Sequence, residues 1–200
     1  TFKWLGLDYD SFFRQSERVD RYRELITKML DEGTAVKRDG AVFLNVKDFE
    51  TSWNDIIIGD VPVSEKDREV INNTVLVRSD GNILYNAATV FDDYDSKISL
   101  IVRGADHISN CSRQVHIFKA LGAPIPKFAH MGLIFHEKRK ISKRDGIFAL
   151  SNYKDMHPEA VLNAVLKLGW GHPDSTLDKK LPTINKLKAI EIFSEGKLKS

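Results

Sequence analysis

The feature that most constrains the fold is an apolar run at residues 98–102, which stops at Arg103 and is typical of a strand buried on both faces. A helical pattern follows it and ends at Gly122, before two prolines. The chain then returns to an apolar segment at residues 129–135. Strand, helix and strand in this order predict a βαβ unit in a parallel sheet, where ligands bind beyond the carboxyl ends of the strands.

Helix-forming patterns flank this unit. Residues 16–30 carry apolar side chains at helical spacing, with Ser16 placed to cap the helix and Gly33 to end it. Residues 158–168 predict another amphipathic helix, and Ser109 or Ser112 could cap the helix of the βαβ unit. Residues 1–10, around Gly6, are typical of a helix end that turns into a loop.

Residues 36–63 have a different character, with short β-rich phrases separated by polar turns. Pro62 disfavours a central strand there, because proline cannot donate to a ladder hydrogen bond. Residues 74–78 and 83–85, separated by Ser-Asp-Gly-Asn, predict two strands joined by a tight turn. We therefore expect a small α+β insert ahead of the parallel sheet.

Composition excludes several classes of protein. Thirty basic and 28 acidic residues nearly balance, so any nucleic-acid surface must be local. The single cysteine, Cys111, excludes an internal disulfide and a zinc site built from several thiolates. No apolar run reaches membrane-spanning length, and no signal peptide is evident. The chain begins at Thr1 inside an apolar phrase, from which we expect a fragment.

The loop from Lys140 to Gly146, Lys-Ile-Ser-Lys-Arg-Asp-Gly, places three cations and a hydroxyl after the second predicted strand. Lysine ammonium groups can follow charge as it builds on a phosphoryl group, which suits polyphosphate binding. Taken alone, such a run is more often a solvated turn.

Several phrases in this chain occur together in one known family. RSDGNILYN, IVRGADHISN, HIFKALGAPIPKFAHMGLIF and KISKRDG follow one another in that order. Together they resemble glutamyl-tRNA synthetase, a class I aminoacyl-tRNA synthetase, of the bacterial or organellar type. The resemblance implies an α/β, Rossmann-like catalytic domain with a parallel sheet, a small α+β insert and the start of a helical stem-contact domain.

The resemblance also implies domain boundaries. Residues 1–33 would be the end of the first Rossmann half with its entry helix, 34–78 a short acceptor-binding insert without zinc, 79–150 the second Rossmann half, and 151–200 the start of the stem-contact domain. The lysine-rich stretch at residues 179–199 could touch tRNA phosphates, although a solvated helix face fits nearly as well.

For ATP, the resemblance implies that the KISKRDG loop binds the nucleotide and stabilises charge as the α-phosphate is attacked. Lys140 and Lys143 would be the catalytic residues. The ATP-binding set would be Lys140, Ser142, Lys143, Arg144 and Asp106. Magnesium would accompany ATP. Some members of the family carry a cysteine-rich zinc site in the insert, but Cys111 is the single cysteine, so we expect no metal ligands within this chain.

For glutamate, the resemblance implies binding by Arg103 and Tyr85. A guanidinium matches a carboxylate, although spacing alone leaves open an ion pair between Arg103 and Asp92 or Asp93. Without the resemblance, a strand tyrosine would more often be a core residue. The histidines show no metal-ligand spacing and are interpreted as structural or surface residues; they are His116, His130, His136, His157 and His172.

Two departures from the family pattern are present: the first weakens the resemblance at its own position only, and the second bears on activity. Ala105 stands where the family often has an acid, and the His-x-Gly-His signature of class I synthetases is absent from these residues. We therefore expect that this chain alone does not activate glutamate.

The expected function is that of a glutamate–tRNA ligase, with ATP, L-glutamate and tRNA(Glu) as its substrates. One alternative is the paralogue that attaches glutamate to the queuosine of tRNA(Asp), and another is a non-catalytic tRNA-binding fragment. We expect a cytoplasmic or organellar monomer without membrane association.

Overall fold

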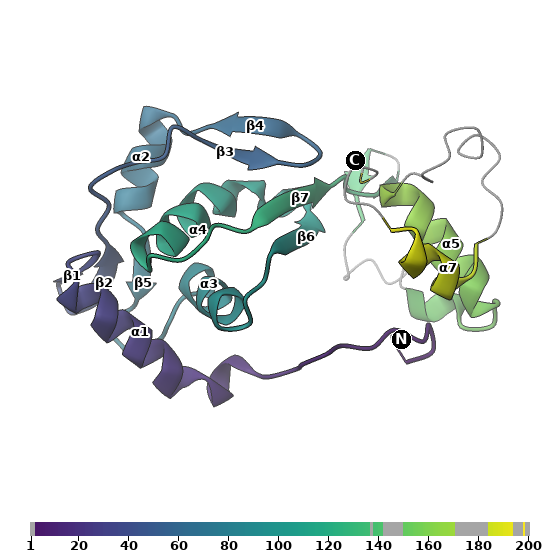
Figure 1. The fold of residues 1–200 in the computed structure, drawn as a ribbon, viewed down its shortest axis with the longest axis horizontal. Coiled ribbons are helices and arrows are strands. Elements are labelled where there is room, and N and C mark those ends of the chain that lie inside the picture. Colours follow the sequence, from purple (N-terminus) through teal and green to yellow (C-terminus); the bar gives the residue numbers. More distant parts are fainter. Residues whose placement is uncertain (1–2, 137, 142–149, 171–183, 194–197, 199–200) are drawn as a thin grey trace.

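The computed structural model of the chain describes residues 3–136, 138–141, 150–170, 184–193 and 198. Figure 1 shows a larger α/β body and, beside it, a smaller helical part. The body contains, in chain order, α1 (Val19–Asp31), β1 (Ala35–Arg38), β2 (Ala41–Leu44), β3 (Ser52–Asp55), β4 (Gly59–Pro62), α2 (Glu65–Asn72), β5 (Val75–Val77), α3 (Tyr85–Asp95), β6 (Leu100–Gly104), α4 (Ile108–Ala120) and β7 (Lys127–Met131). A small hairpin of β8 (Phe135–His136) and β9 (Arg139–Lys140) precedes the helical part, which contains α5 (Pro158–Gly169) and α7 (Lys186–Glu191).

The main sheet has the strand order β4-β3-β7-β6, and β6 and β7 are parallel neighbours connected through α4. The predicted βαβ unit is thus confirmed. The prediction that its first strand is buried on both faces is wrong: β6 is an edge strand in the described part of the chain, and Val102 is 46% exposed. The second strand ends at Met131, short of the predicted residue 135.

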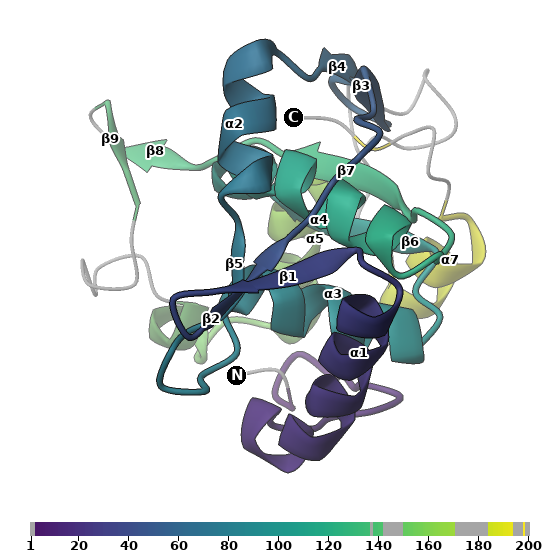
Figure 2. The same cartoon turned by 90° about the vertical axis from the view of Figure 1, so that its left-hand side faces the viewer.

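The β3–β4 hairpin extends the main sheet, because Asp55 of β3 pairs in parallel with Phe128 of β7. Pro62 lies in β4, which is the opposite edge strand, so the sequence prediction that Pro62 avoids a central strand is confirmed. A separate antiparallel sheet has the order β1-β2-β5 and lies beside α1 and α2 (Figure 2). The domain division proposed from the sequence remains a prediction.

The prediction of a second hairpin strand at residues 83–85 is wrong. Ile83 makes a single antiparallel bridge to Val77, and Tyr85 begins α3 instead of ending a strand. The reason is the sequence that follows, which places apolar residues at helical spacing. Four of them are buried on one face of α3: Ala87, Ala88, Val90 and Phe91.

The ends of α1 and α4 follow glycine chemistry. Gly33 has φ +71°, and the amide of Thr34 donates to Met29 O at 2.9 Å, as the sequence predicted for the end of α1. Gly122 ends α4 in the same way, with φ +66°. The predicted serine caps are wrong, because Ser16 lies in a 3-10 turn ahead of α1, and Ser109 and Ser112 lie inside α4.

The core of the body lies between the helices and both sheets. Tyr22 of α1 packs against Phe91 of α3, with ring centroids 5.8 Å apart. The largest buried side chains come from α1, α3, α4 and the two sheets, and include Tyr22, Phe91, Phe118, Phe128, Met29 and Leu44. This core fixes β6 and β7, and therefore the residues at their carboxyl ends.

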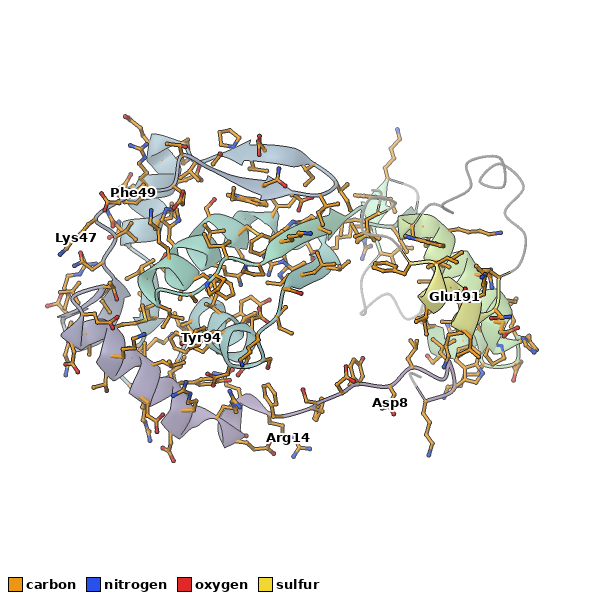
Figure 3. All side chains as sticks on the ribbon, viewed as in Figure 1. Asp8, Arg14, Lys47, Phe49, Tyr94 and Glu191 are labelled. Atoms are coloured by element: carbon orange, nitrogen blue, oxygen red, sulfur yellow. The ribbon has the colours of Figure 1, made fainter. Side chains whose placement is uncertain are left out.

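The amino-terminal segment joins the helical part. Residues 3–6 form a turn with Gly6 at φ +64°, and Lys186 Nζ of α7 donates to Gly6 O at 2.6 Å. In Figure 3 the chain runs as an extended segment past Asp8 and Arg14 toward the body. The helix end predicted before this turn is not seen in the described residues, whereas the helix predicted at 158–168 is confirmed as α5. Of the helices in the described ranges, none has the length and apolar character needed to cross a bilayer.

Candidate functional site at the carboxyl ends of β6 and β7

Arg103 lies near the end of β6, and its guanidinium is held on one edge. Nε donates to His130 Nε2 at 3.1 Å, and Nη2 donates to Cys111 Sγ at 2.8 Å. The guanidinium also lies 5.8 Å from the centroid of the Phe128 ring. Arg103 is half-buried, so its guanidinium is held by these contacts and remains partly accessible to solvent.

Neither acid considered as an ion-pair partner bonds Arg103 in the described part of the chain. Asp92 accepts a hydrogen bond from Tyr22 Oη at 2.7 Å and lies 3.6 Å from Arg18 Nε. Burial raises the pKa of Asp93 to about 6, with a further increase from the charge of Asp92 and a partial offset from Arg103. Arg103 therefore interacts electrostatically with Asp93 but forms no ion pair with either acid.

His130 and Asp55 support Arg103 from behind. His130 Nδ1 lies 2.7 Å from Asp55 Oδ2, and both side chains are fully buried. Asp55 also accepts from the backbone amides of Ile57, Ile58 and His130. These four donors compensate for the burial of the carboxylate.

The sequence predicts that His130 is a structural or surface residue and predicts no role for Asp55. The full burial of His130 confirms the structural alternative, whereas its contacts with Arg103 and Asp55 were not predicted. The available signal was a histidine inside the apolar strand Lys-Phe-Ala-His-Met, because a buried polar residue requires a partner. His116 also fits the structural interpretation: it is buried, and its Nδ1 lies 2.6 Å from Ser112 O.

Asp106 and Lys140 are brought together although they lie 34 residues apart. Lys140 Nζ donates to Asp106 Oδ2 at 2.7 Å, and this hydrogen bond is the main cause that lowers the pKa of Asp106. Gly104 makes room for the Asp106 carboxylate, since a Cβ at position 104 would lie 2.6 Å from Asp106 Oδ1. Three other predicted ATP-binding residues lie outside the described residues: Ser142, Lys143 and Arg144.

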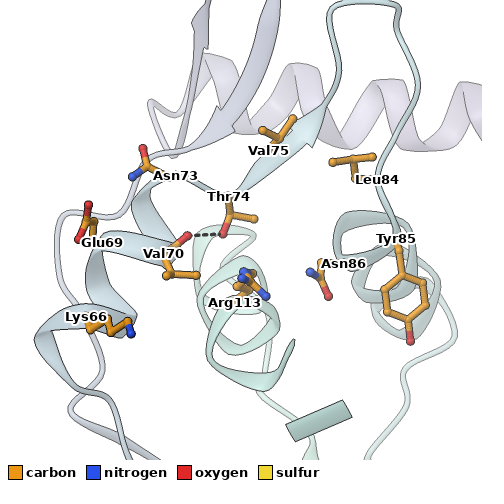
Figure 4. Close-up of a pocket in the computed structure, with 10 residues that line it drawn as sticks. All are labelled: Lys66, Glu69, Val70, Asn73, Thr74, Val75, Leu84, Tyr85, Asn86 and Arg113. Carbon is orange, nitrogen blue, oxygen red and sulfur yellow. Dashed lines mark hydrogen bonds between the residues drawn. The ribbon is translucent and has the colours of Figure 1, made fainter. Parts of the chain in front are cut away.

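Tyr85 is 52% exposed, so the alternative of a core tyrosine is wrong. Its hydroxyl lies 3.4 Å from Nδ1 of His107, which follows β6. Tyr85 also borders a cleft of about 620 Å³ between α2, β5, α3 and α4 (Figure 4). The cleft carries the cations Lys66 and Arg113 among its lining residues.

Together these residues provide a fixed guanidinium, an exposed phenol and a solvent-exposed lysine–aspartate pair near the ends of parallel strands. This set can bind a carboxylate and a phosphate. In the described residues, no group of three or more His, Cys, Asp or Glu side chains could hold a metal ion.

Comparison with known proteins identifies the family. The family description "tRNA synthetases class I (E and Q), catalytic domain" matches residues 43–197. The chain is 41% identical over 195 residues to glutamate–tRNA ligase 2 of Neorickettsia sennetsu, covering 96% of this chain and 46% of that protein. It is 32% identical over 222 residues to glutamate–tRNA ligase of Methylobacillus flagellatus, covering 88% of this chain and 47% of that protein.

The fold has solved counterparts. A crystal structure of a glutamate tRNA ligase from Elizabethkingia meningosepticum, in complex with its amino acid, superposes with a TM-score of 0.75 at 22% identity and covers 99% of this chain and 54% of that chain. The present chain thus spans about half the length of the relatives it matches. The α/β class I synthetase fold expected from the sequence is confirmed, and the chain belongs to the family of class I tRNA synthetase catalytic domains of the E and Q type.

Proposed function

We propose that this chain contributes the glutamate and nucleotide site of a glutamate–tRNA ligase. In the first step an oxygen of the α-carboxylate of glutamate attacks the α-phosphorus of ATP, and pyrophosphate leaves. In the second step a ribose hydroxyl at the 3′ end of tRNA(Glu) attacks the carbonyl carbon of the glutamyl-adenylate, and AMP leaves. The observation that carries the proposal is the Arg103 guanidinium, held near a strand end by His130 and Cys111 without an acidic hydrogen-bond partner among the described residues.

Arg103 would bind the side-chain carboxylate of glutamate. A guanidinium binds a carboxylate through two parallel N–H···O bonds, which distinguishes glutamate from glutamine by charge as well as by shape. Tyr85 would add its hydroxyl, which is exposed and near His107. The names of the relatives at 41% and 32% identity support glutamate as the amino acid.

Lys140, together with Ser142, Lys143 and Arg144, would bind the phosphates of ATP. Lys140 would exchange Asp106 for a phosphate oxygen, and Asp106 would then face the nucleotide. Lys140 and Lys143 would offset the charge that develops on the α-phosphate during attack. We expect magnesium to arrive bound to ATP, with phosphate oxygens among its ligands.

The acceptor end of tRNA(Glu) would cross the insert at residues 34–78. The cleft beside Tyr85 supports this route, because Lys66 and Arg113 can pair with backbone phosphates there. We further propose that the enzyme is a monomer and acts in the cytoplasm or in an organelle, as expected for a relative of bacterial ligases.

The test is ATP–pyrophosphate exchange by the intact gene product, with glutamate or glutamine as the amino acid, followed by charging of purified tRNA(Glu) and tRNA(Asp). Glutamate-dependent exchange and charging of tRNA(Glu) are expected. Exchange followed by modification of queuosine-containing tRNA(Asp) alone would identify the paralogue instead. Binding of tRNA without any exchange, with or without tRNA in the exchange assay, would refute catalysis and leave a tRNA-binding module.

A further inference from the structure

The guanidinium of Arg103 has two edges that can bind a carboxylate through paired hydrogen bonds. One edge consists of Nε–H and an N–H of Nη2, and the other consists of Nη1 and the second N–H of Nη2. In this structure Nε bonds His130 and Nη2 bonds Cys111. Because Cys111 Sγ and His130 Nε2 lie 3.5 Å apart, they occupy the first edge together.

The second edge is available. Among the described residues, no side chain or carbonyl accepts a hydrogen bond from Nη1 of Arg103. A carboxylate that binds Arg103 through two hydrogen bonds must therefore approach along the Nη1–Nη2 edge. His130 and Cys111 therefore determine which edge of the Arg103 guanidinium is available to a substrate, because they occupy the other edge.

The hydrogen bonds also fix the tautomer of His130. Arginine can only donate, so His130 Nε2 accepts and the ring proton sits on Nδ1. That proton points to Asp55 Oδ2, at 2.7 Å. Burial is the largest cause that lowers the pKa of His130; the hydrogen bond to Asp55 opposes it and the charge of Arg103 adds to it, and the net lowering favours a neutral ring whose Nε2 can accept.

Asp55 anchors the whole arrangement to the main sheet. It ends β3, its Oδ1 accepts from the amides of Ile57 and Ile58, and its Oδ2 accepts from the amide and the ring of His130. His130 in turn sits opposite Arg103 in the register of β6 and β7. Three neighbouring strands thus define one orientation of a single guanidinium.

We propose that His130, oriented by Asp55, is a positioning residue that sets the rotation of the Arg103 guanidinium and so the binding pose of the glutamate side chain. This inference rests on the proposed function. It adds two residues that do not touch the amino acid, and it predicts that their loss affects glutamate more than ATP.

Two substitutions separate the two hydrogen bonds of His130. In His130→Gln the amide oxygen reaches the position of Nε2, so the bond from Arg103 is kept and the bond to Asp55 is lost. In His130→Asn the amide reaches only the position of Nδ1, so the bond to Asp55 is kept and Arg103 is released. Both variants are neutral and polar, which makes them matched controls for each other.

The experiment measures pyrophosphate exchange by the intact gene product and its two variants. We expect His130→Asn to raise KM for glutamate about 10-fold or more, since it breaks a hydrogen bond to a charged group. His130→Gln should raise it less, and KM for ATP should stay unchanged in both. Equal effects of the two variants, or a parallel rise in both KM values, would overturn the proposal.

A second measurement does not depend on the reaction. The Nε–H signal of Arg103 in a nitrogen-15 NMR spectrum, identified by its absence in Arg103→Lys, should exchange slowly with water in the wild type and in His130→Gln, and rapidly in His130→Asn. If the wild type shows no glutamate-dependent pyrophosphate exchange, the proposed function fails. The NMR result then still decides whether His130 positions Arg103, because rapid proton exchange of the Arg103 Nε–H with water in the wild type would refute the positioning role as well.

Discussion

Lys140 Nζ and Asp106 Oδ2 lie 2.7 Å apart, which pairs the first cation of the Lys140–Gly146 loop with an acid just past β6. The two side chains are 44% and 41% exposed. An ion pair this open to solvent contributes only about 0–1 kcal/mol, so a polyphosphate can displace Asp106 at little cost. The pair therefore holds Lys140 near the end of β6 and leaves its ammonium group able to bind a phosphate instead.

Substitution of Lys140 by Ala should lower kcat for pyrophosphate exchange by roughly 10²–10³-fold, because one donor to the developing phosphate charge is lost. Lys138 provides the control, since it carries the same charge in the turn between β8 and β9 and has φ +65°. Asparagine tolerates that backbone conformation, so Lys138→Asn should leave kcat unchanged. Equal losses in both variants would show that the hairpin's general charge matters and that Lys140 has no specific role.

The stability of the body should depend on pH through Asp93. Burial raises its pKa to about 6, above its unfolded value, so the folded state binds the proton more tightly than the unfolded state. Stability is therefore greatest when Asp93 is protonated, and this contribution is lost as the pH rises from about 4 through about 6. Asp93→Asn should remove that decline and raise the free energy of unfolding at pH 7 by roughly 1–3 kcal/mol.

Asp95 is the matched control for Asp93. Hydrogen bonding from Arg21 is the main cause that lowers the pKa of Asp95, so its contribution to stability is present at neutral pH and lost in acid. Asp95→Asn should accordingly lower stability at pH 7, with the opposite sign to Asp93→Asn. Urea unfolding between pH 4 and 8 measures both, and a pH-independent difference between wild type and Asp93→Asn would contradict the assignment.

The sequence predicts local features of this fold well and long-range partners poorly. Gly33 and Gly122 end their helices as predicted, because the left-handed conformation is a property of the residue itself. The pairing of β3 with β7 is set by tertiary packing, so neither the edge position of β6 nor the contact between Asp55 and His130 could be read from residues 75 positions apart. The prediction that Tyr85 ends a strand is wrong because it gave more weight to the turn signal before Tyr85 than to the helical pattern after it.

For the site, the position of Arg103 near a strand end was predictable from the apolar run before it, whereas the edge it presents depends on His130 and Cys111. The single sequence contains no information on which of several histidines lies beside that arginine. The contact between Lys140 and Asp106 was equally hidden, although both residues were assigned to ATP from the family resemblance.

Charge reversal in the cleft beside Tyr85 should separate tRNA binding from glutamate activation. Arg113→Glu should weaken charging of tRNA(Glu) and reduce the salt slope of tRNA binding by about one, the value for one lost phosphate contact. Pyrophosphate exchange, measured with saturating tRNA(Glu) so that weaker tRNA binding does not limit it, should persist. Arg23→Glu on the exposed face of α1 makes the same charge change outside the insert and away from the cleft, and it should leave charging intact.

The space beside Gly104 predicts an effect at a position that carries no functional group. A Cβ there would lie 2.6 Å from Asp106 Oδ1 and 3.4 Å from Leu133 Cδ2, so Gly104→Ala must push the Asp106 carboxylate aside. Asp106 would then leave the position from which we propose that it faces the nucleotide, so KM for ATP should rise while KM for glutamate changes less. The double variant Gly104→Ala with Asp106→Ala removes the clash. If Asp106 is the path of the effect, the double variant should be no worse than Asp106→Ala alone, and additive losses would place the damage in the backbone of β6.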